Sequence, residues 1–261
     1  MIDALYVAAT GMHTQESQIN TISNNLTNLN TVGYKKSRVT FSDLFYRDRL
    51  NQTNQIPGQA NVGSERIGMG STIARINKVF ADGDIKITDN PLDLAIRGKG
   101  FFEVELDNGE LAYTRNGAFK VREDGLIATL DNHPLTANIR IPPDARNVQI
   151  NNQGLVVALL GNDNLPTELG QLELSTFFND AALNPIGENL YLANNESGNP
   201  AYGFPGELTT GEIRQGGLES SNVDLVEELI DLTIAQRAYE VNSQIVRASD
   251  EILRINNNLR Q

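Results

Sequence analysis

Two stripes of apolar residues, one near each end of the chain, constrain the fold more than any other feature of the sequence. Near the start, apolar residues recur at alternating intervals of three and four, interrupted only at Gln15; they are Leu5, Ala8, Met12, Ile19, Ile22, Leu26 and Leu29. Near the end the same spacing is unbroken; its members are Ile234, Ala238, Val241, Ile245, Ala248, Ile252, Ile255 and Leu259. Apolar residues every 3.5 positions form a narrow helical stripe that is buried against other helices. We therefore predict that both ends form helices that pack against helices.

The C-terminal helix carries a second apolar stripe in its first half. Its members are Leu225, Leu229, Leu232 and Tyr239. A two-stranded coil would leave one of the two stripes in water, so the pattern favours a bundle or a packed tube of several helices. A monomeric helical hairpin that packs on the rest of the chain is the alternative.

Helix signals set the expected limits of these terminal segments. The first helix should run from about Ile2 to about Thr31, with Gly33 as its stop, within an N-terminal segment 1–33. The second should begin at a capping box formed by Ser221 and Asp224, within a C-terminal segment 218–261. The first helix also has an uncharged polar face that could line a channel; it consists of Gln15, Gln18, Asn20, Asn24, Asn25 and Asn28.

The chain between the two helices divides into two further segments. Residues 34–79 lack a clear period, and 46–71 are rich in Gly, Asn and Gln, which is typical of an exposed loop or extended arm. Residues 80–217 contain short strand-like runs separated by turns such as Asp107-Asn108-Gly109, Asn116-Gly117 and Asp124-Gly125. The spacing predicts an antiparallel β-domain, a sandwich or a partly open barrel. The expected fold class is α+β, with a helical inner domain, a connecting arm and a central β-domain.

Composition excludes several classes of function. The 261 residues carry a net charge of −12, which would repel nucleic acid and anionic lipid headgroups. No apolar run reaches the ~18 residues needed to span a bilayer, so we expect no membrane insertion. The first residues do not resemble a cleavable secretion signal, because Asp3 stands where basic residues would be.

The sequence offers no pattern for catalysis or for ligand binding. His13 and His133 have no second imidazole nearby, and no nucleophile elbow or phosphate-binding loop is present. Gly98-Lys99-Gly100 is better explained as a tight turn, and the many Asp and Glu pairs are expected by chance. We predict that the chain is not an enzyme and has no catalytic, cofactor-binding or metal-binding residue.

Several motifs, in the same order along the chain, resemble the bacterial flagellar rod and hook proteins. They occupy residues 23–28 and 30–36 at the start, 90–102 and 112–119 in the centre, and 221–224, 227–230 and 236–243 at the end. The residues that we take as the family motif are Asn24, Asn25, Leu26, Asn28, Gly33, Asn222, Gln236, Arg237, Tyr239 and Asn242. Within the family, the length and residues 188–191 favour a subunit of the distal rod, with a proximal rod subunit as the alternative.

The resemblance implies a structural subunit that polymerises helically into a hollow drive shaft across the periplasm and transmits torque to the hook. It also implies export from the cytoplasm by the flagellar type III apparatus. Its expected partners are further copies of itself, proximal rod and hook subunits at its ends, and the surrounding bushing rings. A secreted monomeric binding module is a further alternative. For the arm at 46–71, we hypothesise contacts with neighbouring subunits that keep the rod straight.

The stripes and the resemblance lead to the same assembly interface. On the first helix it comprises Leu5, Met12, Ile19, Ile22, Leu26 and Leu29. On the second it comprises Leu225, Leu229, Leu232, Ile234, Val241, Ile245, Ile252, Ile255 and Leu259.

Overall fold

The computed structural model describes residues 2–49, 65–160 and 165–258, and the chain divides into two compact units. Unit 1 comprises Met1–Leu26, Ser37–Asn77 and Leu225–Gln261, and unit 2 comprises Thr27–Lys36 and Lys78–Asp224. The chain therefore passes between the units four times. Terminal helices with antiparallel strands between them confirm the α+β class.

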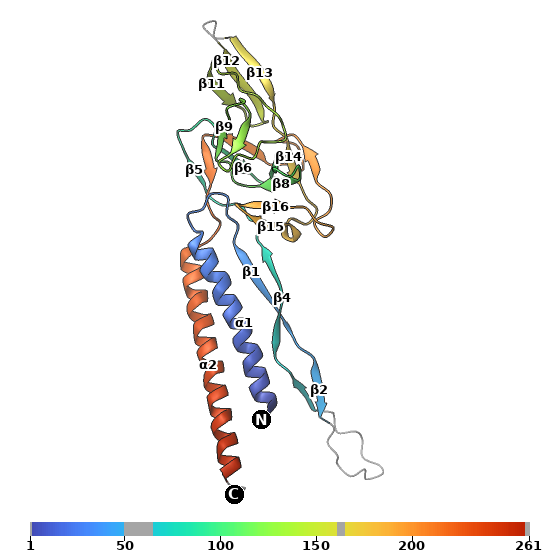
Figure 1. Cartoon of the computed structure of the whole chain (residues 1–261), viewed down its shortest axis with the longest axis vertical. Coiled ribbons are helices and arrows are strands. Elements are labelled where there is room, and N and C mark those ends of the chain that lie inside the picture. Colours follow the sequence, from blue (N-terminus) through green and yellow to red (C-terminus); the bar gives the residue numbers. More distant parts are fainter. Residues whose placement is uncertain (1, 50–64, 161–164, 259–261) are drawn as a thin grey trace. The chain divides into compact units, whose positions relative to one another are not determined.

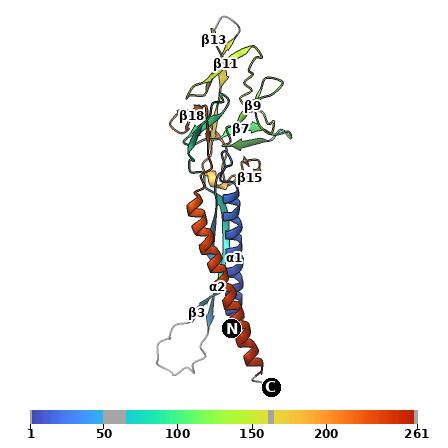
Figure 2. The same cartoon turned by 90° about the vertical axis from the view of Figure 1, so that its left-hand side faces the viewer.

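Unit 1 is built on two long helices, α1 (Ile2–Thr27) and α2 (Leu225–Asn258), which lie side by side and run in opposite directions (Figure 1). Figure 2 shows the same pairing from a second direction. Asp3 lies in the first turn of α1, and Glu227 and Glu228 lie in the first turn of α2. Acidic side chains there interact favourably with the positive end of the helix dipole.

The remainder of unit 1 is a β-hairpin where an exposed loop or extended arm was expected. Strand β1 (Ser37–Asp43) pairs with β4 (Ser71–Lys78), and β2 (Tyr46–Arg49) pairs antiparallel with β3 (Glu65–Gly68). Backbone hydrogen bonds from Leu44 to Gly70 and from Met69 to Phe45 join the two pairs. The expectation of a loop is thus wrong for both described ends of 46–71, and residues 50–64 lie outside the described part of the chain.

Unit 2 consists of short antiparallel strands in several small sheets. The largest sheet has the order β15 (Asn184–Gly187), β16 (Leu190–Leu192), β8 (Leu111–Thr114), β7 (Phe102–Glu105). A three-stranded sheet has the order β11 (Ala145–Ile150), β12 (Leu155–Leu160), β13 (Leu165–Gln171). In the described residues these sheets replace the expected sandwich or barrel.

The other strands of unit 2 form two-stranded sheets, and a short 3₁₀ turn, η1 (Asp180–Ala182), precedes β15. The pairs are β9 (Phe119–Val121) with β10 (Ile127–Thr129), β14 (Leu174–Thr176) with β17 (Ala201–Gly203), β6 (Leu94–Arg97) with β18 (Glu212–Gln215), and β5 (Ile85–Ile87) with β19 (Gly217–Glu219).

Turn residues explain much of this arrangement. Gly109 and Gly125 adopt φ of +81° and +84° between paired strands, as predicted. Asn116-Gly117 is not such a turn, because Gly117 has no positive φ. A Cβ at this position would collide with the carbonyl oxygen of Leu94, so close approach to β6 requires the glycine.

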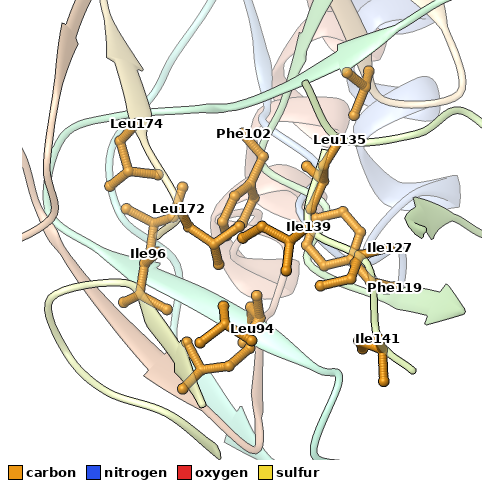
Figure 3. Close-up of a cluster of buried hydrophobic side chains, with 14 of the residues drawn as sticks. Leu94, Ile96, Phe102, Phe119, Ile127, Leu135, Ile139, Ile141, Leu172 and Leu174 are labelled. Atoms are coloured by element: carbon orange, nitrogen blue, oxygen red, sulfur yellow. The ribbon is translucent and has the colours of Figure 1, made fainter. Parts of the chain in front are cut away.

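One buried apolar cluster lies between the sheets of unit 2. Figure 3 shows Phe102, Phe119, Ile127, Leu135 and Ile139 side by side in this cluster. Each fully buried side chain of this kind stabilises the fold by roughly 1.5–3 kcal/mol. This core depends only on residues of unit 2.

Both terminal helices are shorter than predicted at the ends that lead into unit 2. Helix α1 ends at Thr27, because the next residues form turns and Gly33 donates its N–H to the carbonyl of Glu219. Helix α2 begins at Leu225, because residues 217–219 pair with β5 instead. The capping box is therefore wrong, and the Ser221 hydroxyl is buried without a hydrogen-bond partner.

Net charge differs strongly between the two units. Unit 2 holds 22 of the 33 acidic residues and 12 of the 21 basic ones, which gives it −10 of the total charge of −12. Unit 1 holds the remaining 11 acidic and 9 basic residues, a net charge of −2. The acidic character of the chain is thus a property of its β-domain.

Candidate assembly surface

The apolar stripe of α1 is used inside unit 1. Ala8 and Ile22 are buried, and the other helical members of the stripe are half-buried. These are Leu5, Met12, Ile19 and Leu26. Thr14 of the same helix is also buried, and its hydroxyl lies 3.4 Å from that of Ser71 at the start of β4. Leu29, the last predicted member, is half-buried in the turns after α1 and belongs to unit 2.

The apolar stripe of α2 is exposed in the single chain. Its exposed fractions are 59 % for Ile234, 54 % for Val241, 41 % for Ile245, 49 % for Ile252 and 51 % for Ile255. In the second stripe Leu225 and Leu229 are exposed and Leu232 is half-buried, whereas Leu259 lies outside the described residues. We call the five exposed residues from Ile234 to Ile255 the α2 seam.

A different face of α2 packs inside unit 1. Glu228, Ala235 and Ser249 are buried there, and Asn242 and Val246 are half-buried. Because successive residues are about 100° apart around a helix, this face lies about 100° from the α2 seam. Small and polar side chains, together with Val246, therefore occupy the packed face of α2, whereas the large apolar side chains of the seam stay at least 41 % exposed.

Asn25 connects three elements of unit 1. Its Nδ2 donates to the carbonyl of Ser37, the first residue of β1, at 3.0 Å and to Oε2 of Glu228 at 3.2 Å. Its Oδ1 accepts from the N–H of Ser37 at 2.9 Å, and the side chain is 1 % exposed. The expectation that Asn25 belongs to a polar face lining a channel is thus wrong, because the amide is enclosed within unit 1.

Gly11 and Asn242 mark a close approach of the two helices. A Cβ on Gly11 would lie 2.8 Å from Nδ2 of Asn242. This contact and the Asn25–Glu228 hydrogen bond fit the same antiparallel register of α1 and α2. In this register the start of α1 lies opposite about residue 251 of α2. Because α2 has 34 residues and α1 has 26, the end of α2 extends beyond α1 (Figure 1).

In unit 2, three segments that lead toward unit 1 are tied together into what we call the collar, residues 33–36, 79–83 and 219–222. The side chain of Asn222 accepts a hydrogen bond from the N–H of Lys36 at 2.8 Å. It also donates to the carbonyls of Val79 at 2.8 Å and Ala81 at 3.1 Å. One amide thus fixes the spacing of all three segments.

A buried ion pair lies at the centre of the collar. Lys35 Nζ is 2.6 Å from Glu219 Oε1, and both side chains are almost completely buried. Nζ also donates to the carbonyl of Ala81 at 2.7 Å, and Oε1 accepts from the N–H of Gly83 at 2.9 Å. Arg115, with Nη1 3.6 Å from Glu219 Oε2, adds a second positive charge.

Burial changes the pKa of the lysine in this ion pair. Desolvation lowers the pKa of Lys35 from its usual 10.5, and the charge and hydrogen bond of Glu219 oppose this shift. Removing one partner of such a pair leaves an uncompensated buried charge, which typically costs about 3–5 kcal/mol. The collar therefore depends on both residues together.

Comparison with known protein families finds matches to three segments of the chain. Residues 5–35 match the family model "Flagella basal body rod protein". Residues 95–158 match "Flagellar hook protein FlgE/F/G D1 domain", and residues 214–259 match "Flagellar basal body rod FlgEFG protein C-terminal".

Full-length relatives agree with these matches. The "Flagellar basal-body rod protein FlgG" of Agrobacterium fabrum is 40 % identical, and the alignment covers 97 % of each chain. The protein of the same name from Borreliella burgdorferi is 38 % identical, with complete coverage of both chains. The chain belongs to the flagellar rod and hook protein family. The predicted family resemblance is thereby confirmed.

The motif residues of this rod and hook family member have different structural positions. Asn25, Asn222 and Asn242 lie at the contacts described above. Gly33 has φ of +68°, and a Cβ there would lie 2.7 Å from the backbone of Arg115 and Asn116, so the close contact requires glycine.

The remaining motif residues are less enclosed. Leu26 and Asn28 are half-buried, and Asn28 Oδ1 accepts a hydrogen bond from the Thr31 hydroxyl at 3.1 Å. The exposed ones are Asn24, Gln236, Arg237 and Tyr239. The motif thus combines residues that hold one chain together with residues on the surface of both helices.

The described residues contain no group of His, Cys, Asp or Glu side chains arranged to hold a metal ion. Within the same residues, neither helix has an apolar stretch of the length and hydropathy that a membrane crossing requires.

Sequence reasoning missed the collar ion pair. Lys35 lies inside the N-terminal motif, but its partner Glu219 is far away in sequence, as is Arg115, the second cation beside that carboxylate, and neither carries a periodic signal. The available signal was the position of Lys35 within the N-terminal motif, two residues after Gly33, because a lysine that is buried there requires a carboxylate from elsewhere in the chain.

Proposed function

We propose that the chain is a structural subunit of the distal rod of the bacterial flagellar basal body. The observation that carries this proposal is the α2 seam, five large apolar side chains of the heptad stripe that remain exposed in the single chain. Because each of these side chains is about half exposed, burying the rest of it would contribute roughly 1 kcal/mol, and assembly with other subunits would provide that burial. The relatives named as FlgG rod proteins support the same function.

In this function the subunits polymerise helically into a hollow shaft that crosses the periplasm and transmits torque to the hook. We infer contacts with further copies along the shaft and with proximal rod and hook subunits at its ends. Export by the flagellar type III apparatus and contact with the surrounding bushing rings also belong to the proposal. The work of the chain is then mechanical and not catalytic.

We infer different roles for the two sets of interface residues. The α2 seam, with Leu225 and Leu229, supplies the surface that packs against other subunits. The stripe of α1 supports that surface from within unit 1. For the arm at 46–71 we propose contacts with neighbouring subunits that stiffen the rod, so deleting 50–64 should give curved or flexible assemblies, and straight rods from this deletion would contradict the role.

The proposal is tested by concentrating the full-length protein and following assembly by sedimentation and negative-stain electron microscopy. Wild-type protein should form rods, and Ile245→Asp should remain monomeric with a folded β-domain. The matched control is Gln244→Asp, which adds the same charge at an exposed neighbouring position outside the seam. A monodisperse wild-type protein would favour the secreted binding module.

A proximal rod subunit is the second candidate within the family. Distal and proximal subunits are distinguished by expressing the chain in strains that lack one or the other rod gene. Restored motility in the strain without the distal subunit is the expected result. Restoration only in a proximal mutant would reverse the assignment.

A further inference from the structure

Unit 1 contains an apolar cavity near the first turns of α1. It has a volume of about 410 Å³ and is lined by Ala4, Val7 and Ala8 of α1, Ile67 of β3, and Asn242 and Ile245 of α2, with Asp3 completing its wall. Its wall includes one member of the α2 seam, Ile245, so the cavity is continuous with the exposed stripe. A cavity of this size readily takes a branched aliphatic side chain.

Unit 1 also carries apolar side chains that remain exposed at the end of α2. In the register set by Asn25–Glu228 and Gly11–Asn242, residues after about 251 lie beyond the start of α1. Ile252 and Ile255 are on this overhang, and each is about half exposed. Both belong to the α2 seam.

The overhang cannot fill the cavity of its own chain. Ile252 and Ile255 follow the cavity residue Ile245 by 7 and 10 residues on one continuous helix. At 1.5 Å per residue, they lie about 10–15 Å farther along the helix axis. Ile252 or Ile255 can therefore enter such a cavity only in another molecule.

We propose that the α2 overhang of one copy inserts Ile252 or Ile255 into the cavity formed by Ala4, Val7 and Ile245 of a second copy. This inference rests on the proposed function and specifies one contact within it. The inserted surface and the receiving cavity are different parts of the molecule, so the contact is heterologous. Each copy keeps a free cavity and a free overhang, and such a contact propagates into an open helical polymer instead of closing as a dimer.

Disulfide trapping can test this contact directly, because the chain contains no cysteine. The variant carries both Ala4→Cys and Ile255→Cys. After assembly and mild oxidation, a heterologous contact should give a ladder of covalent multimers on a non-reducing gel. A closed, two-fold symmetric contact would stop at dimers. A mixture of the two single variants should also stop at dimers, because each chain then has one thiol.

The control variant carries Ala4→Cys and Ile230→Cys. Ile230 is about as exposed as Ile255 but lies near the other end of α2. We expect the ladder from the Ala4/Ile255 pair and not from the control pair. Rods that form normally but give no ladder with the Ala4/Ile255 pair would overturn this contact and leave the rod function intact. Absence of wild-type rods would instead contradict the rod function.

A second variant tests the energetic role of the contact. Val7→Asp places a charge in the wall of the cavity, where an inserted isoleucine would have to bury it. We expect the protein concentration needed for assembly to rise at least about tenfold, with unfolding of the monomer unchanged. An unchanged assembly threshold would contradict the proposal.

Discussion

Helices α1 and α2 have the same spacing of apolar residues, but they bury their stripes in different places. The stripe of α1 lies against the rest of unit 1, with Ile22 5 % exposed. The stripe of α2 stays largely exposed in the single chain, with Ile234 59 % exposed. A heptad period thus predicts that a helix face is buried, but it does not specify whether the same molecule covers it.

The contact faces of the helices explain this difference. On the packed face of α2, Glu228 accepts a hydrogen bond from Asn25 of α1, and Asn242 lies against Gly11 of α1. Ala235 is buried between these two contacts along α2. Hydrogen bonds and a close glycine contact are directional, so they fix one register. The apolar seam is then left exposed in the single chain, where it is available for the proposed contacts with other copies.

Ile22→Asp should have the largest effect on the monomer. The new carboxylate would be buried without a partner, which should destabilise unit 1 by about 4 kcal/mol or more. Thermal unfolding followed by circular dichroism of the helices measures this loss. The paired variant Ile234→Asp should change monomer stability by no more than about 0.5 kcal/mol, because Ile234 is 59 % exposed. Equal losses in both variants would refute the comparison of the two stripes.

Glu219→Gln should destabilise unit 2 by about 3 kcal/mol or more, because Lys35 would keep a buried charge without its carboxylate. Chemical denaturation is followed by tyrosine fluorescence in a background with Tyr6, Tyr46 and Tyr239 of unit 1 changed to Phe, so that the remaining tyrosines all lie in unit 2. Since the collar and the helix faces involve different residues, the loss should leave the helical signal of unit 1 in place at low denaturant. Simultaneous loss of both signals would show that the two units unfold together.

The same variant should show a diagnostic pH dependence. Burial lowers the pKa of Lys35 below 10.5, so the unfolded chain binds its proton more tightly than the folded chain does. Stability contributed by this group therefore rises with pH in the range just below 10.5. Without Glu219 to oppose the effect of burial, the pKa of Lys35 in the folded variant falls further, so the pH range over which stability rises becomes wider. The loss of unfolding free energy in Glu219→Gln, relative to the wild type, should therefore shrink as the pH is raised from neutral. A deficit independent of pH would argue against a buried ammonium.

Asn25→Ala should cost about 1–3 kcal/mol, because it leaves backbone groups of Ser37 and an oxygen of Glu228 without this partner. Asn20→Ala, at an exposed position of the same helix, is the matched control and should stay within about 0.5 kcal/mol. Comparable losses of unfolding free energy in the two variants would contradict the role of the Asn25 hydrogen bonds in fixing the register of α1 against α2.

Gly11→Ala should have the smallest effect. Alanine favours the helix by about 1 kcal/mol, whereas its Cβ must displace the amide end of Asn242. These effects oppose each other, so we expect a net change within about 1 kcal/mol. A loss well above this value, measured by thermal unfolding, would show that Asn242 cannot move.

The sequence predicted the terminal helices and the β-rich centre because their periods and turns are local signals. The Asn108-Gly109 turn, for example, requires only neighbouring residues. The hairpin β1–β4 was missed because its strands are only partly buried and have weak alternation. The end of α1 was placed too late because Gly33 is held by Glu219, far away in sequence.

The candidate surface was predictable only as a set of residues. The stripes identify Ile22 and Ile245 equally well, but side-chain exposure in the folded chain is needed to separate them. Asn25 was placed on the wrong face because a hydrogen bond to a distant Glu228 leaves no trace in the local pattern. Long-range polar pairs were thus beyond the reach of periodicity.

The unequal charge of the two units has a consequence for growth of the polymer. In the proposed rod, every added copy would bring a β-domain with a net charge of −10 close to others of the same sign. This repulsion is long-ranged in dilute buffer and is screened beyond about 10 Å at 0.1 M salt, whereas burial of the α2 seam is largely indifferent to moderate salt. Added sodium chloride should therefore weaken the repulsion between β-domains and favour elongation. The protein concentration at which rods begin to grow should fall as the salt concentration rises.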